Sequence, residues 1–247
     1  MSRPETAILL VAGLGRRLGS DLPKCLVPLG DGTTLLQRAA HALASAGVER
    51  LVLATGHREE AIAEAARELP LPCELRRNPD YDRTQNAVSL WHCREAVRGE
   101  PFYKLDGDVL FRPEVIERLA ACPAPVAVAL DRAASLGDEE MKVLVQDGRI
   151  VAFGKGLDPS RAHGETLGIE RFDAASGARL FAALEAAVAA GRTDIYYEDV
   201  YGDLVAEGIA FAPVDVSDLP WTEVDTPEDL ARARSLAASH PAPAAPR

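Results

Sequence analysis

The chain has 247 residues, 47% of them hydrophobic, and 38 acidic against 27 basic residues give it a formal net charge of −11. That balance argues against nucleic acid or an anionic membrane as a partner, because either needs a broad basic face. The sequence contains no run of eighteen apolar residues and no signal-peptide core, so we expect a cytoplasmic location without membrane insertion. We expect one domain over residues 1–238 and a disordered Pro/Ala-rich tail over 239–247.

The first half of the chain alternates short apolar runs with helical patterns. A buried strand is predicted at 7–11, and a helix at 35–46 ends before Gly47. Further strands are predicted at 50–55, 73–77 and 102–105, with helices at 59–69 and 87–98. Alternation at this interval favours right-handed crossovers and a mostly parallel sheet.

The pattern of predicted elements differs in the second half of the chain. Segments 142–145 and 149–153 flank Asp147-Gly148, a strong hairpin turn. Helices are predicted at 174–190 and at 227–238, the latter with Thr226 as N-cap and Pro227 at its first position. The expected fold is therefore α/β, with a Rossmann-like, mixed but mostly parallel sheet flanked by helices and a small antiparallel addition in the second half.

A glycine-rich segment with three cations follows the first strand. Residues 12–18 read A-G-L-G-R-R-L, and Pro23-Lys24 comes shortly after. Glycines let backbone N–H groups approach phosphate oxygens, while Arg and Lys offset the charge of a triphosphate. The segment therefore predicts a site for a small anionic ligand, with a nucleoside triphosphate favoured.

Two other interpretations of this segment stay open. One is a surface loop with solvated arginines, and the other is a dinucleotide-binding turn. The spacing of Gly13, Gly15 and Gly19 is G-x-G-x-x-x-G instead of G-x-G-x-x-G, and Pro23 lies too close for a long helix to follow. We therefore expect the segment to stay a loop.

The four cysteines are widely spaced and have no histidine at metal-ligand spacing: Cys25, Cys73, Cys93 and Cys122. They are most simply small buried apolar residues. Cys25 is the exception to examine, since its position beside Lys24 favours a lowered thiol pKa. No nucleophilic role is assigned to it.

Carboxylates follow the strand at 102–105 and precede the last helix. Asp106-Gly107-Asp108 is suited to a hard divalent cation, although acidic residues are also common in plain turns. Asp225 is expected to meet Asp108 across the sheet and to clamp Mg²⁺ against phosphate oxygens. The alternative is that Glu223 and Asp225 only complement a helix N-terminus.

Taken in order, these motifs resemble the nucleotidyltransferases that join a nucleoside triphosphate to a small phosphorylated alcohol or sugar. The signature A-G-x-G-x-R-[LM], a short gap and P-K is matched at 12–18 and 23–24, the G-D metal motif at 107–108, and D-T-P-E-D-L at 225–230. The resemblance runs from about 6 to 238, with Val11 in place of the frequent Ala as one departure. Such an ordered set is more specific than any single motif.

The middle of the chain most resembles the phosphocholine, inositol-phosphate and phosphonate cytidylyltransferases. The residues that carry this are N-A-V-S-L at 86–90, E-M-K-V at 140–143, and the pairs 154–155, 164–165 and 168–169. The resemblance implies a GT-A-like fold with a Rossmann-like sheet, Mg²⁺-dependent transfer and release of pyrophosphate. It also implies a possible homodimer, because related enzymes often pair.

The resemblance assigns roles to the nucleotide end of the site. Arg17 and Lys24 would hold the triphosphate with the backbone of Ala12, Gly13 and Gly15. Asp108 and Asp225 would ligate Mg²⁺. Gln85, Asn86 and Ser89 would read the base and ribose, although Ser89 alone also fits a solvent-facing helix position. The acceptor oxygen would attack the α-phosphorus in line, so no covalent nucleophile is needed.

The acceptor end is less clearly marked. Lys155 would bind the acceptor phosphate, with a solvated turn lysine as the alternative. Glu165, Tyr197, Glu198 and Trp221 combine aromatics with carboxylates, a mixture that suits an ammonium group but also inositol or sugar hydroxyls. Plain core packing of the aromatics is a third interpretation.

The expected function is transfer from CTP to a small alcohol phosphate or phosphonate, with an amino-alcohol type slightly preferred. One alternative is a uridylyl- or guanylyltransferase that acts on a sugar 1-phosphate. A glycosyltransferase would bind a finished nucleotide sugar, and the triphosphate loop argues against it. A non-catalytic nucleotide-binding module is disfavoured because the carboxylates and lysines are all present.

Overall fold

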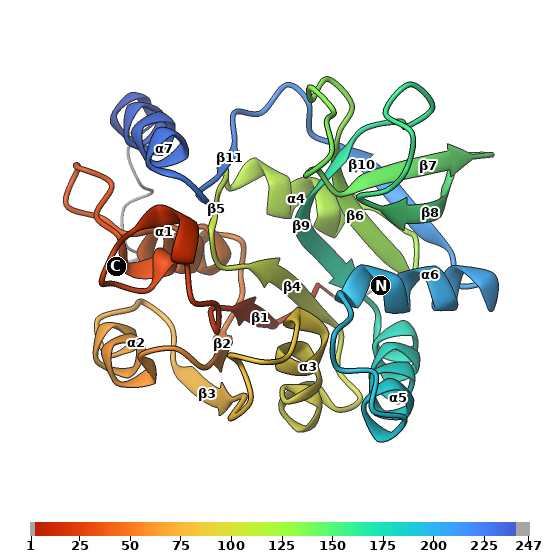
Figure 1. Ribbon diagram of the computed structural model, residues 1–247, viewed down its shortest axis with the longest axis horizontal. Helices are drawn as coiled ribbons and strands as arrows, with labels where there is room; N and C mark the ends of the chain where they lie inside the picture. The colour runs from red at the N-terminus through yellow and green to blue at the C-terminus, as the bar shows by residue number, and fades with distance from the viewer. Residues whose placement is uncertain (1–2, 241–247) are drawn as a thin grey trace.

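The computed structural model describes residues 3–240. It contains a nine-stranded mixed sheet with helices on both faces (Figure 1). The strands are β1 (Thr6–Leu10), β2 (Arg50–Thr55), β3 (Cys73–Arg77), β4 (Phe102–Asp106), β6 (Val126–Asp131), β7 (Lys142–Gln146), β8 (Arg149–Gly154), β9 (Glu165–Phe172) and β10 (Phe211–Asp215). Their order in space is β3-β2-β1-β4-β9-β6-β10-β8-β7. A separate two-stranded sheet joins β5 (Val109–Leu110) to β11 (Thr222–Glu223).

Most strands of the large sheet run in the same direction. The strands β3, β2, β1 and β4 pair in parallel, and so do β6 and β10. Between these two groups β9 is antiparallel to both β4 and β6. The hairpin of β7 and β8 closes one edge. The predicted mostly parallel sheet with an antiparallel addition is therefore confirmed, but the antiparallel β9 in its middle was not foreseen.

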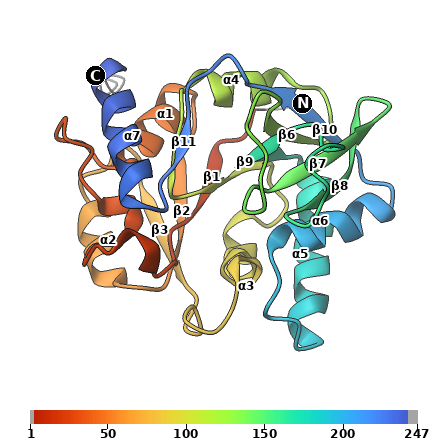
Figure 2. The same cartoon turned by 45° about the horizontal axis from the view of Figure 1, so that its top comes forward.

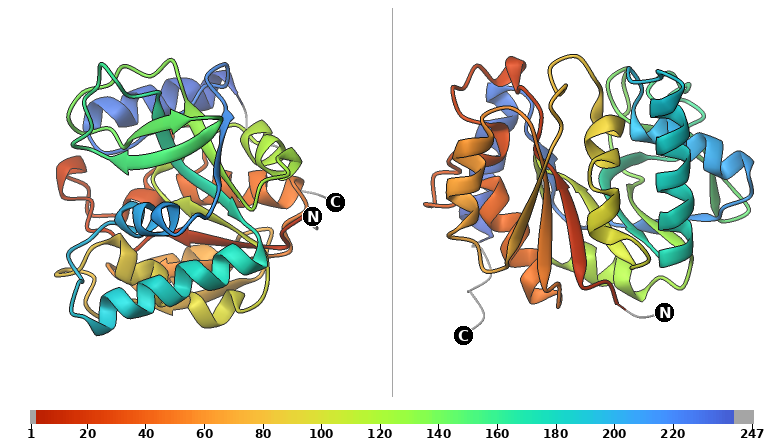
Figure 3. Two further views of the ribbon diagram at one scale, coloured as in Figure 1. Left: turned by 90° about the vertical axis from the view of Figure 1, so that its right-hand side faces the viewer. Right: turned by 90° about the horizontal axis from the view of Figure 1, so that it is seen from below.

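Helices cover the two faces of the sheet in separate groups, as the right-hand view of Figure 3 shows. On one face α1 (Leu35–Ser45), α2 (Glu59–Ala66) and α4 (Glu114–Ala121) pack against alternate strand residues such as Leu9, Leu53 and Leu105. On the other face α3 (Asn86–Trp91), α5 (Ala174–Ala189) and α6 (Tyr197–Ala206) pack against Ile8 and Val52. Burial of both faces explains why central strands such as β1 and β2 are largely apolar.

The last helix, α7 (Pro227–Ser239), begins with a capping box between Thr226 and Asp229 and has Pro227 in its first turn, as predicted. It packs beside the start of α1 through an apolar cluster that includes Leu35 and Ala233 (Figure 2). The helix ends at Ser239, one residue later than expected. Residues 241–247 of the predicted tail lie outside the described residues.

Two predicted helices are shorter in the structure. The helix predicted at 87–98 ends at Trp91 and gives way to a 3-10 turn over Arg94–Val97, in which Ala96 N–H donates to Cys93 O at 3.0 Å. The helix predicted at 59–69 ends at Ala66, after which i to i+3 hydrogen bonds tighten the chain. In both cases the shorter hydrogen-bond step ends the regular helix.

Strand β9 was missed because charges interrupt its apolar pattern. Glu170 and Arg171 are both buried, and each is compensated from elsewhere in the fold. Glu170 lies 3.2 Å from Lys104 Nζ, while Arg171 donates to the carbonyls of Leu119 and Cys122. Strand β10, which lies beyond β6, was missed because it contains Pro213, a residue type that is disfavoured within a strand. No helix within residues 3–240 is both long and apolar enough to cross a membrane.

Candidate active site

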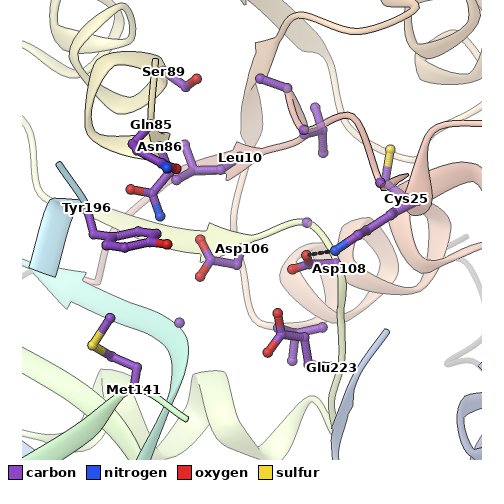
Figure 4. Close-up of a pocket in the computed structure, with 18 of the residues that line it drawn as sticks. Leu10, Cys25, Gln85, Asn86, Ser89, Asp106, Asp108, Met141, Tyr196 and Glu223 are labelled. Carbon is purple, nitrogen blue, oxygen red and sulfur yellow. Dashed lines mark hydrogen bonds and ion pairs between the residues drawn. The ribbon is translucent and has the colours of Figure 1, made fainter. Parts of the chain in front are cut away.

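A cavity of about 450 Å³ opens at the carboxyl ends of β1 and β4. Ligands of open α/β sheets bind at this edge. Figure 4 shows Gln85, Asn86 and Ser89 on one side of the cavity and Asp108 with Glu223 at one end, while Asp106 lies between Asp108 and Tyr196. The cavity therefore joins segments that are far apart in the sequence.

The glycine-rich segment forms the wall next to β1. Gly15 adopts a left-handed conformation with φ of 59°, and a short 3-10 turn over Arg16–Leu18 follows it. Lys24 begins a second such turn and its side chain passes directly over Gly15, where a Cβ would lie 2.9 Å from Lys24 Cγ. The segment stays a loop, as expected, and both its backbone and Lys24 line the cavity.

Three carboxylates converge opposite this loop. Ligand oxygens of Asp108, Glu223 and Asp225 lie within 4.8 Å of one another. The small sheet brings them together, because Glu223 pairs with Val109 and the N–H of Val224 donates to the Asp108 carbonyl at 2.9 Å. Glu223 was not predicted as a member of the metal set, although its spacing of two from Asp225 places both side chains on one side of an extended chain.

Two cations contact these carboxylates directly. Lys24 Nζ lies 3.0 Å from Asp108 Oδ2 and also pairs with Asp225. The guanidinium of Arg17 pairs with Asp225 from the outside. Burial alone would lower the pKa of Lys24, but the attraction of Asp108 and Asp225 outweighs it and raises this pKa.

Two carboxyl groups of the acidic cluster have raised pKa values. Burial raises the pKa of Glu223 to about 8, and the nearby Asp108 and Asp225 add to the shift. Burial also raises the pKa of Asp108, against the opposing effect of Lys24. The three convergent carboxylates form a donor set that a hard divalent cation fits.

The predicted base and ribose residues lie on α3 at the cavity wall, and two of them also have structural partners. Asn86 Oδ1 accepts a hydrogen bond from the N–H of Tyr197 at 3.0 Å. Ser89 Oγ accepts one from Asn78 Nδ2 at 3.0 Å. Gln85 stands at the N-cap of the helix, with its side chain free of a capping bond. All three line the cavity, so the structure brings them together as the sequence suggested.

The far end of the cavity holds the predicted acceptor residues. Lys155 Nζ lies 5.5 Å above the ring of Tyr196 and 3.7 Å from Glu139 Oε2. Trp221 lines the cavity while its Nε1 donates to Asp131 Oδ2 at 2.9 Å. Burial raises the pKa of Glu165 to about 7, and Glu140 and Asp131 add to the shift. One lysine therefore stands among several carboxylates at this end.

Three sequence expectations differ from what the structure shows. Tyr197 is fully buried and does not line the cavity, whereas its neighbour Tyr196 does. Arg17 lies at the rim on Asp225, and its neighbour Arg16 lines the cavity. Cys25 is 3% exposed, and burial with the nearby Asp108 raises the pKa of its thiol to about 12, the reverse of the expected direction.

A cationic glycine loop that faces convergent carboxylates at a sheet edge defines the class of nucleotide-triphosphate-binding transferases. The chain belongs to the MobA-like NTP transferase domain family, whose model matches residues 7–195. The resemblance to nucleotidyltransferases inferred from the motifs is thereby confirmed.

Two curated relatives match over most of this chain. The chain is 35% identical to the CMP-5'-(3-aminopropyl)phosphonate synthase of Streptomyces rubellomurinus, with 93% of this chain and 38% of the relative covered. It is 32% identical to the bifunctional IPC transferase and DIPP synthase of Rubrobacter xylanophilus, with 91% and 50% covered. It thus spans half or less of the length of these two relatives.

A solved structure agrees with this placement. The inositol-1-phosphate CTP transferase from T. maritima superposes with a TM-score of 0.80 at 25% identity, covering 95% of this chain and 96% of that one. The mixed α/β nucleotidyltransferase fold therefore extends over nearly the whole chain.

Proposed function

We propose that this protein is a Mg²⁺-dependent cytidylyltransferase that transfers CMP from CTP to a small phosphonate or alcohol phosphate and releases pyrophosphate. The proposal rests on the arrangement of charged groups in one cavity. At one end the cationic glycine loop and Lys24 face three carboxylates, and Lys155 lies at the other end. The CMP-5'-(3-aminopropyl)phosphonate synthase and the solved inositol-1-phosphate CTP transferase, whose names refer to CMP and CTP, support the choice of nucleotide.

In this proposal the acceptor oxygen forms a bond to the α-phosphorus while the bond from that phosphorus to the bridging β-oxygen breaks. Lys24, with Arg17 at the rim, offsets the charge that develops on the departing pyrophosphate. Lys155 holds the phosphonate or phosphate of the acceptor in line with the nucleotide. A divalent cation bound by Asp108, Glu223 and Asp225 supplies charge neutralisation for the triphosphate.

The base and ribose are assigned to α3 and the glycine loop. The side chains of Gln85, Asn86 and Ser89, with the backbone of Ala12 and Gly13, line the same part of the cavity. Positioning by these groups, rather than a strong base, accounts for most of the expected rate enhancement. The homodimer and the cytoplasmic location expected from the sequence stay predictions.

The experiment is a pyrophosphate-release assay with Mg²⁺ in which CTP, UTP, GTP and ATP are each paired with four acceptors. The acceptors are 2-aminoethylphosphonate, phosphocholine, inositol 1-phosphate and glucose 1-phosphate. We expect release with CTP and a phosphonate or alcohol phosphate. Release only with UTP or GTP and glucose 1-phosphate would instead identify a sugar nucleotidyltransferase, and silence throughout would overturn the proposal.

A variant pair tests the metal assignment. Asp108→Asn should lower turnover at least about 100-fold, because a bound cation supplies several kcal/mol of transition-state stabilisation. Asp147→Asn makes the same chemical change at the β7–β8 turn, away from the cavity, where Asn tolerates the φ of 49°. Equal activity of the two variants would remove Asp108 from the metal site.

A further inference from the structure

A buried charged network lies beneath the acceptor end of the cavity. Lys104 on β4 is fully buried, and its Nζ lies 3.1 Å from Asp106 Oδ1 and 3.2 Å from Glu170 Oε2. It also donates to the Gly168 carbonyl at 3.3 Å. A lysine ammonium has three N–H donors, so these contacts use all of them. Lys104 has none left for a fourth partner.

Tyr197 contacts this network through both its hydroxyl group and its ring. Its hydroxyl donates to Asp106 Oδ2 at 2.6 Å, so both oxygens of Asp106 have partners. Lys104 Nζ lies 3.3 Å from the centre of the Tyr197 ring. That ring already holds a cation on its face and cannot offer it to a ligand.

Glu198 is the member of the network whose bonding is incomplete. It is 6% exposed, it lines the cavity, and its Oε2 has no hydrogen-bond partner among residues 3–240. Capping does not explain it, because Asp199 already makes the capping box at the start of α6. An unpaired buried carboxylate oxygen is costly, which indicates a partner that arrives from the cavity.

The charges of the network indicate what that partner carries. Three carboxylates, of Asp106, Glu170 and Glu198, act on the single cation Lys104. Burial raises the pKa of Glu198 to about 8, and Asp106 and Glu170 add to the shift. A second cation with hydrogen-bond donors would offset part of the carboxylate charge and supply the missing hydrogen bond.

We propose that the acceptor carries a primary ammonium group and that Glu198 binds it, which makes Glu198 the residue that selects aminoalkyl acceptors. The inference rests on the proposed function and names its substrate class. A rotation about the terminal bond of Glu198, which is a soft torsion, turns Oε2 toward the cavity. The phosphonate or phosphate of the same acceptor then contacts Lys155.

Other acceptors of the branch fit less well. A quaternary ammonium has no N–H donor and needs an aromatic cage, but the ring of Tyr197 is covered by Lys104. Of the three aromatics that line the cavity, Tyr81 lies beside Gly56 next to the glycine loop, which leaves Tyr196 and Trp221 for the acceptor end. A polyol donates hydrogen bonds but brings no positive charge to the three carboxylates. A primary ammonium supplies both the charge and three donors.

The test uses acceptors that differ at one group. With CTP and Mg²⁺, kcat/KM is measured for 2-aminoethylphosphonate, 2-hydroxyethylphosphonate and the N,N-dimethyl and N-trimethyl analogues, and phosphoethanolamine separates phosphonate from phosphate. We expect the amine to exceed the hydroxyl compound about 100-fold, with kcat/KM falling at each methylation. Equal use of the amine and hydroxyl compounds, or preference for the trimethyl compound, would overturn the inference.

Glu198→Gln removes the charge without changing the shape. We expect it to reduce the preference for amine over hydroxyl acceptor to within about threefold, while Glu64→Gln on the exposed side of α2 keeps the full preference. An undiminished preference in Glu198→Gln would refute the role of this residue. If that variant does not fold, the wild-type comparison alone decides.

Failure of the inference and failure of the proposed function look different. A protein that releases pyrophosphate from CTP with the hydroxyl or inositol acceptor but ignores the amine is a cytidylyltransferase of another substrate class. A protein that releases none from CTP with any acceptor is not the proposed enzyme. Calorimetric binding of 2-aminoethylphosphonate in the presence of a non-reactive CTP analogue provides a readout that does not depend on turnover.

Discussion

Replacement of Gly168 by alanine probes the packing between β9 and the buried network. Gly168 has φ of +67° and stands where the register between β9 and β6 shifts, as in a glycine bulge. A Cβ at this position would lie 2.8 Å from Asp106 Cγ and closer still to Oδ2. Alanine must therefore both adopt a strained backbone and displace the Asp106 carboxylate.

The two costs can be estimated separately. Alanine in the left-handed region costs about 1–2 kcal/mol. Displacement of Asp106 weakens its bonds to Lys104 and Tyr197, and a hydrogen bond to a charged group contributes about 1.5–3 kcal/mol. If the weakening amounts to the loss of one such bond, the two costs predict that Gly168→Ala lowers the free energy of unfolding by about 2.5–5 kcal/mol.

Urea unfolding of two glycine variants isolates the second cost. Gly191 has φ of +75°, and apart from its chain neighbours no atom of residues 3–240 lies within 4 Å of the place a Cβ would take, so Gly191→Ala measures the backbone strain alone. We expect Gly168→Ala to be destabilised by at least about 1.5 kcal/mol more than Gly191→Ala, the lower end of a charged hydrogen bond. Equal losses in the two variants would show that Asp106 is not held in place by this packing.

Three further predictions concern single side chains. Lys155→Ala should raise the acceptor KM roughly tenfold with little change in kcat or in the KM for CTP, if it binds ground and transition states equally; unchanged steady-state constants would remove it from the site. Native Cys25 should react with iodoacetamide at least about 100-fold more slowly than a free thiol, because its raised pKa leaves little thiolate, and fast labelling followed by mass spectrometry would contradict this. The pKa values of Glu165 and Glu170 are both raised to about 7 in the folded state. Between pH 4.5 and 7 these two carboxyl groups therefore keep their protons in the folded state, whereas in the unfolded state they have released them. The ligand-free protein should therefore lose stability as pH rises from 5 to 7 in urea titrations, and a stability that rises over this range would refute the burial argument.

The nucleotide end of the site was readable from the sequence because most of its parts are local. The loop over 12–18 and Lys24 form one continuous wall, and its chemistry depends on backbone freedom and nearby charge. The Asp147-Gly148 hairpin and the Thr226 capping box are local for the same reason, since their hydrogen bonds join residues a few positions apart. Turns and capping boxes of this kind can be predicted from the residue types alone.

The acceptor end was decided by tertiary structure. Whether Tyr196 or Tyr197 faces the cavity depends on how α6 packs against the sheet, which no local pattern specifies. The antiparallel β9 carries Glu170 next to Lys104 on β4, and only that pairing turns an interrupted apolar pattern into a buried charged network. Glu223 joins the metal set in the same way, through pairing of β11 with β5. The sequence by itself determined the class of chemistry, because motif residues are contiguous. The proposed selectivity depends on long-range pairing, where burial sets the cost of each charge.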